Sequence, residues 1–165
     1  MNIFHVLSQG KARLHEPSMS AMLGYLLDSN KDHGLADSVI RELLQAIDEA
    51  RFRDILSMGF IISEVILESP YELDEERKRS IDIDIVLLDT KKKIIHRVII
   101  ENKIKVGAAN PKQLQEYYQA IMRDRPEEEL TIVFLTPNTS SRQLTAEFNN
   151  LLLEKKEHKK YWIRW

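Results

Sequence analysis

The sequence contains no cysteine, which excludes disulfides, thiolate zinc sites, iron–sulfur clusters and a cysteine nucleophile. With 5 histidines in the chain, any metal site is expected to rely on carboxylate oxygens. Glycine and proline are scarce, with 5 residues of each, so collagen-like and low-complexity classes are also excluded. The composition is that of a chain that folds around a core.

Long apolar runs are missing as well. No stretch approaches the roughly 20 residues that span a bilayer, and the N-terminal residues lack the charged start and long apolar segment of a signal peptide. We therefore expect no membrane partner and a cytoplasmic location. The chain has no P-loop, no dinucleotide fingerprint and no GxSxG motif, so nucleotide hydrolysis, hydride transfer and serine hydrolysis have no support.

The 165 residues fit one domain, which we expect to span 1–165. The net charge is −2, but the two signs are unevenly distributed. Residues 1–90 hold 9 Lys and Arg against 17 Asp and Glu, whereas residues 91–165 hold 15 against 9. An acidic part beside a basic part is compatible with a metal site next to a phosphate-binding surface, and equally with two halves that attract each other.

Apolar periodicity predicts the order ααβββαβα, with a short aromatic segment at Tyr161–Ile163 as a candidate last strand. Helix spacing covers Pro17–Leu27 and then a longer helix from Val39 to near Gly59. A hairpin followed by a helical crossover predicts an α/β fold with a mixed central sheet flanked by helices. The expected remaining elements are a strand from Phe60 to Leu67 stopped by Ser69-Pro70, an exposed loop from Glu72 to Arg79, strands at Ile81–Leu88, Ile94–Ile104 and Leu130–Leu135, and helices at Gln113–Met122 and Leu144–Lys156.

The predicted hairpin carries the chemistry. Its turn contains Lys91, Lys92 and Lys93, so paired residue numbers sum to about 183 or 185. In the second register Asp84 lies opposite Glu101, and in the first Asp82 does. Either register gathers carboxylates on one face, and Lys103 projects from the same face.

Burying such charges is costly unless they are paired or bind a metal. A structural interpretation requires the cluster to neutralise itself, and Lys103 can pair with one acid but not with all of them. The functional interpretation is that Asp84 and Glu101 bind a hard divalent cation such as Mg²⁺, with Lys103 offsetting charge in the transition state. Asp82 is the second choice for the metal position.

Three segments carry a family resemblance: Ile83-Asp84-Ile85-Val86-Leu87, Ile99-Ile100-Glu101-Asn102-Lys103-Ile104, and Gln113-Leu114-Gln115-Glu116-Tyr117. Together they resemble the PD-(D/E)XK nuclease superfamily, including its QxxxY subgroup. The likeness extends upstream to Glu16 and His33-Gly34, and Ser29 departs from it where a proline is expected. It implies the αβββαβ restriction-endonuclease-like core.

The resemblance also implies residue roles. Asp84 and Glu101 would be metal ligands for Mg²⁺ or Mn²⁺, with the Asn102 carbonyl as a further ligand, and Lys103 would be the catalytic lysine. Gln113 and Tyr117 lie at i and i+4 on one helix face and would hold a phosphate or orient the lysine. Two further acids are candidate metal ligands with structural alternatives: Glu16, which also suits the helix dipole, and Glu64, which also suits an arginine partner.

The expected function is metal-dependent phosphodiester hydrolysis, with DNA as the substrate and RNA left open. Lys105, Lys112 and Gln113 follow the catalytic strand and are expected to line the phosphate path. The alternative is a catalytically inactive nuclease-like module that binds nucleic acid or a protein. The aromatic residues near the C-terminus predict core packing or a contact in a homo-oligomer.

Overall fold

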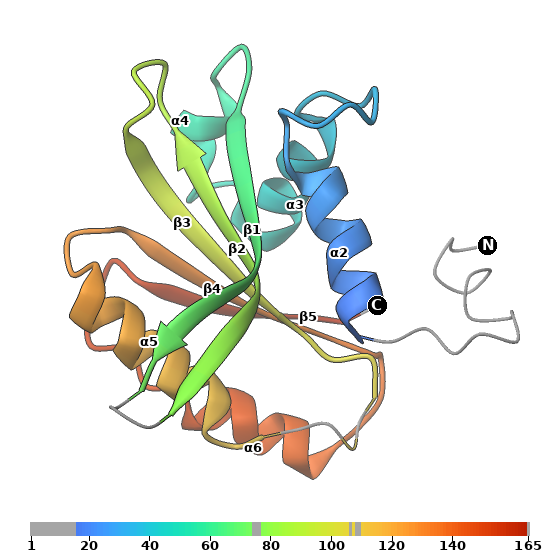
Figure 1. The fold of residues 1–165 in the computed structure, drawn as a ribbon, viewed down its shortest axis with the longest axis vertical. Coiled ribbons are helices and arrows are strands. Elements are labelled where there is room, and N and C mark those ends of the chain that lie inside the picture. The colour runs from blue at the N-terminus through green and yellow to red at the C-terminus, as the bar shows by residue number, and fades with distance from the viewer. Residues whose placement is uncertain (1–15, 74–76, 106, 108–109, 165) are drawn as a thin grey trace, which may run out of the picture.

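The computed structural model describes residues 16–73, 77–105, 107 and 110–164. In this part of the chain, five strands form one sheet in the order β1-β2-β3-β4-β5. The first three strands are antiparallel neighbours, while β3 pairs with β4 and β4 with β5 in parallel. The predicted mixed sheet with helices is confirmed (Figure 1). The elements are α2 (Glu16–Leu27), α3 (Ser38–Asp48), α4 (Arg53–Leu56), β1 (Ile62–Glu72), β2 (Lys78–Leu88), β3 (Ile94–Asn102), α5 (Gln113–Asp124), β4 (Leu130–Thr136), α6 (Arg142–Asn150) and β5 (Lys159–Arg164).

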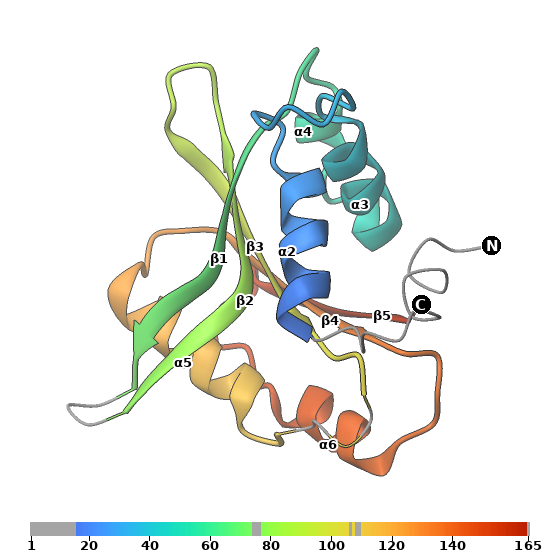
Figure 2. The same ribbon diagram turned by 45° about the vertical axis from the view of Figure 1, so that its right-hand side comes forward.

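Helices cover both faces of the sheet, as Figures 1 and 2 show: α2, α3 and α4 lie on one side, and α5 and α6 on the other. Successive side chains of a strand point to opposite faces of the sheet, so each central strand contributes side chains to both layers. On β3, Val98 and Ile100 pack into the core under α3, whereas Ile99 packs into the core under α5. Glu101 and Lys103 have the parity of Ile99, so they belong to the face that α5 and α6 cover.

The second predicted helix is wrong in its length. The structure divides it into α3, which ends at Asp48, and the one-turn α4. Between them the Asp48 carboxylate accepts hydrogen bonds from the Arg51 amide at 3.0 Å and from the Tyr161 hydroxyl at 2.7 Å. Phe52 is buried at this break. The side chain of Asp48 thus offers the backbone a turn in place of another helical turn.

The first strand is also longer than predicted, because β1 continues through Ser69-Pro70 to Glu72. It lies at the edge of the sheet, where a proline without an N–H group is tolerated. The predicted loop from Glu72 to Arg79 is correspondingly shorter, since β2 begins at Lys78. Helix α6 ends at Asn150 rather than Lys156, because the extended residue Leu151 follows it and packs into the core.

The hairpin of β2 and β3 adopts the first of the two registers, with Asp84 opposite Ile99 and Ile83 opposite Ile100. Asp82 precedes Ile83 and Glu101 follows Ile100, so these two acids come together at the end of the pair. In the described part of the chain, no helix is long and apolar enough to cross a membrane.

Candidate active site

Glu101 and Lys103 form the centre of the candidate site. Both are buried at the end of β3, where the Lys103 ammonium is paired with Glu101 Oε1. Lys103 Nζ also donates to Gln113 Oε1 at 2.9 Å. The Tyr117 hydroxyl lies 2.6 Å from Glu101 Oε2 and accepts a hydrogen bond from Gln113 Nε2 at 2.5 Å. The first turns of α5 therefore hold the side chains of both Glu101 and Lys103, and the i, i+4 spacing of Gln113 and Tyr117 makes this possible.

Asp82 is the second acid of this group. Its Oδ2 accepts a hydrogen bond from the Asn102 amide at 2.9 Å, which ties it to the segment that carries Glu101 and Lys103. Burial, together with the negative charge of Glu101, raises the pKa of Asp82 to about 7. An acid with such a pKa lies in surroundings that disfavour its charge unless a cation is present.

Asp84 lies two residues further along β2 and has different partners. It is 0% exposed, and its Oδ1 accepts a hydrogen bond from Arg97 at 2.5 Å. Ser69 donates to its Oδ2 at 3.1 Å, and Arg125 Nη1 lies 3.8 Å from that oxygen. Arg97 is paired in turn with Glu128. The structure thus places Asp84 in a buried network of ion pairs, where its charge is already neutralised.

Two acids from the helices complete the group around Lys103. Glu16, the first residue of α2, accepts a hydrogen bond from the Ile104 amide at 2.9 Å. Glu147 on α6 is 0% exposed and accepts from the Asn110 amide at 2.9 Å. Burial raises the pKa of Glu147 to about 7, and the Lys103 ammonium limits that rise. Glu147 is a residue that the sequence reasoning missed.

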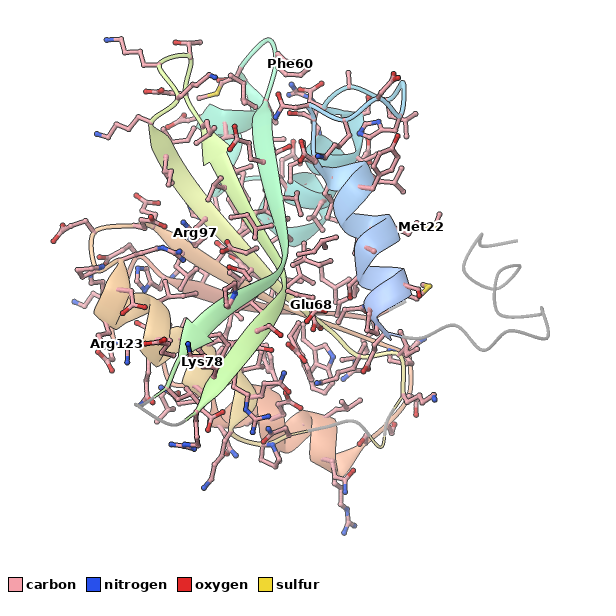
Figure 3. All side chains as sticks on the ribbon, in the orientation of Figure 1. Met22, Phe60, Glu68, Lys78, Arg97 and Arg123 are labelled. Carbon is pink, nitrogen blue, oxygen red and sulfur yellow. The ribbon has the colours of Figure 1, made fainter. Side chains whose placement is uncertain are left out.

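The remaining predicted residues are placed as follows. Glu64 is exposed on β1 opposite Val86, away from Asp82. Glu68 occupies the position on β1 beside Asp82: it bonds to Ser80 Oγ at 2.8 Å and raises the pKa of Asp82 through its charge. Figure 3 shows Glu68 near the bend of β1. Lys105 and Lys112 are exposed and lie within the segment that joins β3 to α5.

Comparison with known families identifies the fold. The family model of the PD-(D/E)XK nuclease superfamily matches residues 1–164. The chain belongs to this superfamily. Searches of curated proteins and of solved structures gave no match.

Membership in the PD-(D/E)XK superfamily makes a divalent metal the cofactor to test against this site. The donor chemistry fits, since Asp82, Glu101 and Glu16 offer hard oxygens and carboxylates outnumber the one ammonium of Lys103. Glu147 Oε1 is a buried oxygen with no hydrogen-bond partner among the described residues. No three acids or histidines of the described chain already surround one point closely enough to hold an ion.

The charge state of Lys103 limits the chemical roles open to this side chain. Burial disfavours its charged form, but the adjacent Glu101 carboxylate outweighs this and raises the pKa of Lys103 above its ordinary value. The pKa of Glu101 is also raised, chiefly by burial. Lys103 is thus cationic at neutral pH, which suits it to stabilise negative charge rather than to act as a base.

Proposed function

We propose that this chain is a metal-dependent nuclease that hydrolyses phosphodiester bonds, with DNA as the favoured substrate. The observation that carries the proposal is the meeting of Asp82, Glu101 and Lys103 at one end of β2 and β3, in a chain of a nuclease superfamily. Phosphodiester hydrolysis needs these groups: oxygens for a cation and a fixed positive charge beside the reacting phosphate. Hydrolysis of RNA requires the same groups, so RNA is included as a substrate in the experiment below.

In this proposal Asp82, in place of Asp84, joins Glu101 as a ligand of Mg²⁺ or Mn²⁺. The reason is electrostatic: Asp84 already has an arginine partner, whereas burial and the charge of Glu101 disfavour the ionised form of Asp82 when no cation is bound. The Asn102 carbonyl and, from α2, Glu16 are further donors, and Glu68 replaces Glu64 as the acid from β1. When bound, the cation polarises a phosphoryl oxygen and lowers the pKa of a bound water.

The side chains from β3 and α5 then have separate tasks. Lys103 presents its positive charge to the phosphate, and Gln113 holds the ammonium in place through its amide oxygen. Tyr117 holds the second oxygen of Glu101, so that the carboxylate keeps one orientation. Pre-set groups of this kind lower the barrier because little reorganisation is needed during the reaction.

A path for the polynucleotide backbone follows the segment between β3 and α5. Lys105 and Lys112 are exposed there, and both follow the buried Lys103 in the chain. Cationic side chains next to the reacting group attract a polyanion by releasing its counterions, whatever the base sequence. This placement favours binding through phosphates rather than through bases.

The test incubates the full-length protein with linear, nicked, circular and single-stranded DNA and with RNA, in Mg²⁺, Mn²⁺, Ca²⁺ or chelator. D82N, E101Q and K103M are expected to lower cleavage by roughly 100-fold or more, since each removes a group that acts on the reacting phosphate. The matched control is E64Q, which removes one exposed acid from β1 and is expected to cleave at the wild-type rate. Wild-type cleavage by K103M, or equal activity in excess chelator, would contradict the proposal.

Binding without cleavage is the rival outcome. Measured with Ca²⁺ in place of Mg²⁺, nucleic-acid affinity is separated from turnover. A chain that binds DNA or RNA but cleaves neither with any cation would be an inactive nuclease-like module. A chain that binds no nucleic acid would leave a protein partner as the better hypothesis.

A further inference from the structure

Glu147 has a buried carboxylate with one satisfied and one unsatisfied oxygen. Its Oε2 accepts a hydrogen bond from the Asn110 amide at 2.9 Å, and its Oε1 has no partner among the described residues. The residue is 0% exposed on α6. A buried carboxylate oxygen without a hydrogen-bond partner is unfavourable. We therefore expect Glu147 Oε1 to gain a partner in another state of the protein.

A chain of hydrogen bonds connects Glu147 to Lys103. The Asn110 carbonyl accepts from the Gln113 amide at 3.0 Å, and the Gln113 side chain accepts from Lys103 Nζ at 2.9 Å. Glu147 therefore fixes Asn110, Asn110 fixes the start of α5 at Gln113, and Gln113 holds the Lys103 ammonium. The charge of Glu147 also acts directly on Lys103 and on Glu101. Glu147 is the one acidic residue of α6.

The arrangement around Glu101 raises a question of charge. In the structure, the Lys103 ammonium is paired with Glu101 Oε1, and the Tyr117 hydroxyl is hydrogen bonded to Oε2. A divalent cation on Glu101 would compete with that ammonium for the same oxygen, and the two positive charges would repel each other. Once displaced, Lys103 keeps the neutral amide oxygen of Gln113 but loses its anionic partner.

We propose that Glu147 is the carboxylate that receives Lys103 when a cation takes Glu101. This inference rests on the proposed metal-dependent function and assigns Glu147 as a positioning residue for the lysine. The unsatisfied Oε1 gains a charged donor in the exchange, and the ammonium stays buried, paired and beside the site. Binding of the cation and placement of Lys103 are thereby coupled through one pair of carboxylates.

The experiment is a double-mutant cycle on Mn²⁺ affinity, measured by calorimetry on the full-length protein without nucleic acid. E147Q keeps an oxygen for the Asn110 amide but removes the charge, and K103M removes the competing ammonium. E147Q is expected to weaken Mn²⁺ binding roughly tenfold in the wild-type background, because Lys103 then has no anionic alternative to Glu101. In the K103M background the same substitution should change affinity less than about threefold.

E154Q is the matched control, since it removes one exposed acid that follows α6 and should leave Mn²⁺ affinity unchanged. Wild-type affinity in E147Q, with an unchanged melting temperature, would overturn the inference and leave Glu147 as an anchor for Asn110 alone. An equal loss of Mn²⁺ affinity in the wild-type and K103M backgrounds would also overturn the inference, because Glu147 would then be a direct ligand of the cation. Wild-type protein that neither binds Mn²⁺ nor cleaves would instead refute the proposed function, and the inference with it.

Discussion

Two aspartates of β2 are expected to have opposite effects on stability, although only one residue separates them. Asp82 lies in an environment that disfavours its charge, whereas Asp84 neutralises a buried arginine. The perturbation is removal of each charge by the isosteric amide, in D82N and D84N, with chelator present to keep the protein metal-free. D82N should stabilise the protein at pH 8, and D84N should destabilise it.

The magnitude for D82N follows from its pKa, which rises from 3.8 to about 7. Each tenfold change in proton affinity is worth about 1.4 kcal/mol, so ionised Asp82 lowers the free energy of unfolding by at most about 4 kcal/mol at pH 8. Because the side chain is partly exposed, solvent screening reduces this to about 1–2 kcal/mol. For a chain of this size the gain corresponds to a rise in melting temperature of about 3–6 °C.

The pH dependence gives an independent check on whether D82N stabilises or destabilises the protein. A carboxyl group with a raised pKa in the folded state stabilises that state fully below pH 3.8, and the contribution is lost as the pH rises through about 7. The advantage of D82N over wild type should therefore shrink as the pH falls from 7 to 4. D84N leaves Arg97 without one of its two carboxylate partners, which should lower stability by about 3 kcal/mol.

Thermal melts followed by circular dichroism between pH 4 and pH 8 measure both effects. The far-ultraviolet spectrum at 20 °C checks that each variant is folded. If D82N melts at or below the wild-type temperature at pH 8, burial and the charge of Glu101 do not disfavour the ionised form of Asp82. If D84N melts at the wild-type temperature, the ion pair between Asp84 and Arg97 does not stabilise the fold. The burial of Asp84 would then need another explanation.

Two further predictions concern ligands. Mn²⁺ affinity should fall as the pH drops below about 7, since protons compete with the cation for Asp82; calorimetry at pH 6 and pH 8 measures this, and equal affinities would speak against Asp82 as a ligand. Replacing Lys105 and Lys112 together by glutamine should flatten the salt dependence of DNA binding by roughly one unit per lost phosphate contact, measured with Ca²⁺. The same change at Lys91 and Lys92, in the turn at the far end of the hairpin, is the charge-matched control and should leave the slope unchanged.

The sheet and its helices were predictable because burial repeats along the chain with the period of each element. The hairpin register was not, since the two registers considered differ by two in the sum of paired numbers. Such a shift leaves every side chain on its own face, so the apolar pattern cannot distinguish Asp82 from Asp84 opposite Glu101. Arg97 was the missed signal: a cation within a buried apolar strand requires an acid, and only one register supplies Asp84 beside it.

Glu147 was not predicted for a different reason. A single glutamate in a polar helix is usually solvated, and nothing in its immediate neighbours is unusual. Its spacing from the buried Leu144 nevertheless places it on the buried side of α6, since residues three apart share a helix face. The partner of Glu147, Asn110, lies far away in sequence, so their contact follows only from the packing of α6 against the segment before α5.

The ion pair between Asp84 and Arg97 has a consequence for how the chain reaches its fold. During folding, β2 and β3 can pair two residues out of step while still burying the same apolar faces. In that misaligned hairpin Arg97 would enter the interior without Asp84, and Asp84 would lie against Glu101. Breaking a buried pair in this way is unfavourable by about 3–5 kcal/mol, which exceeds the thermal energy several-fold. Asp84 thus selects the one alignment in which Asp82, Glu101 and Lys103 meet, and the geometry of these three residues depends on a fourth.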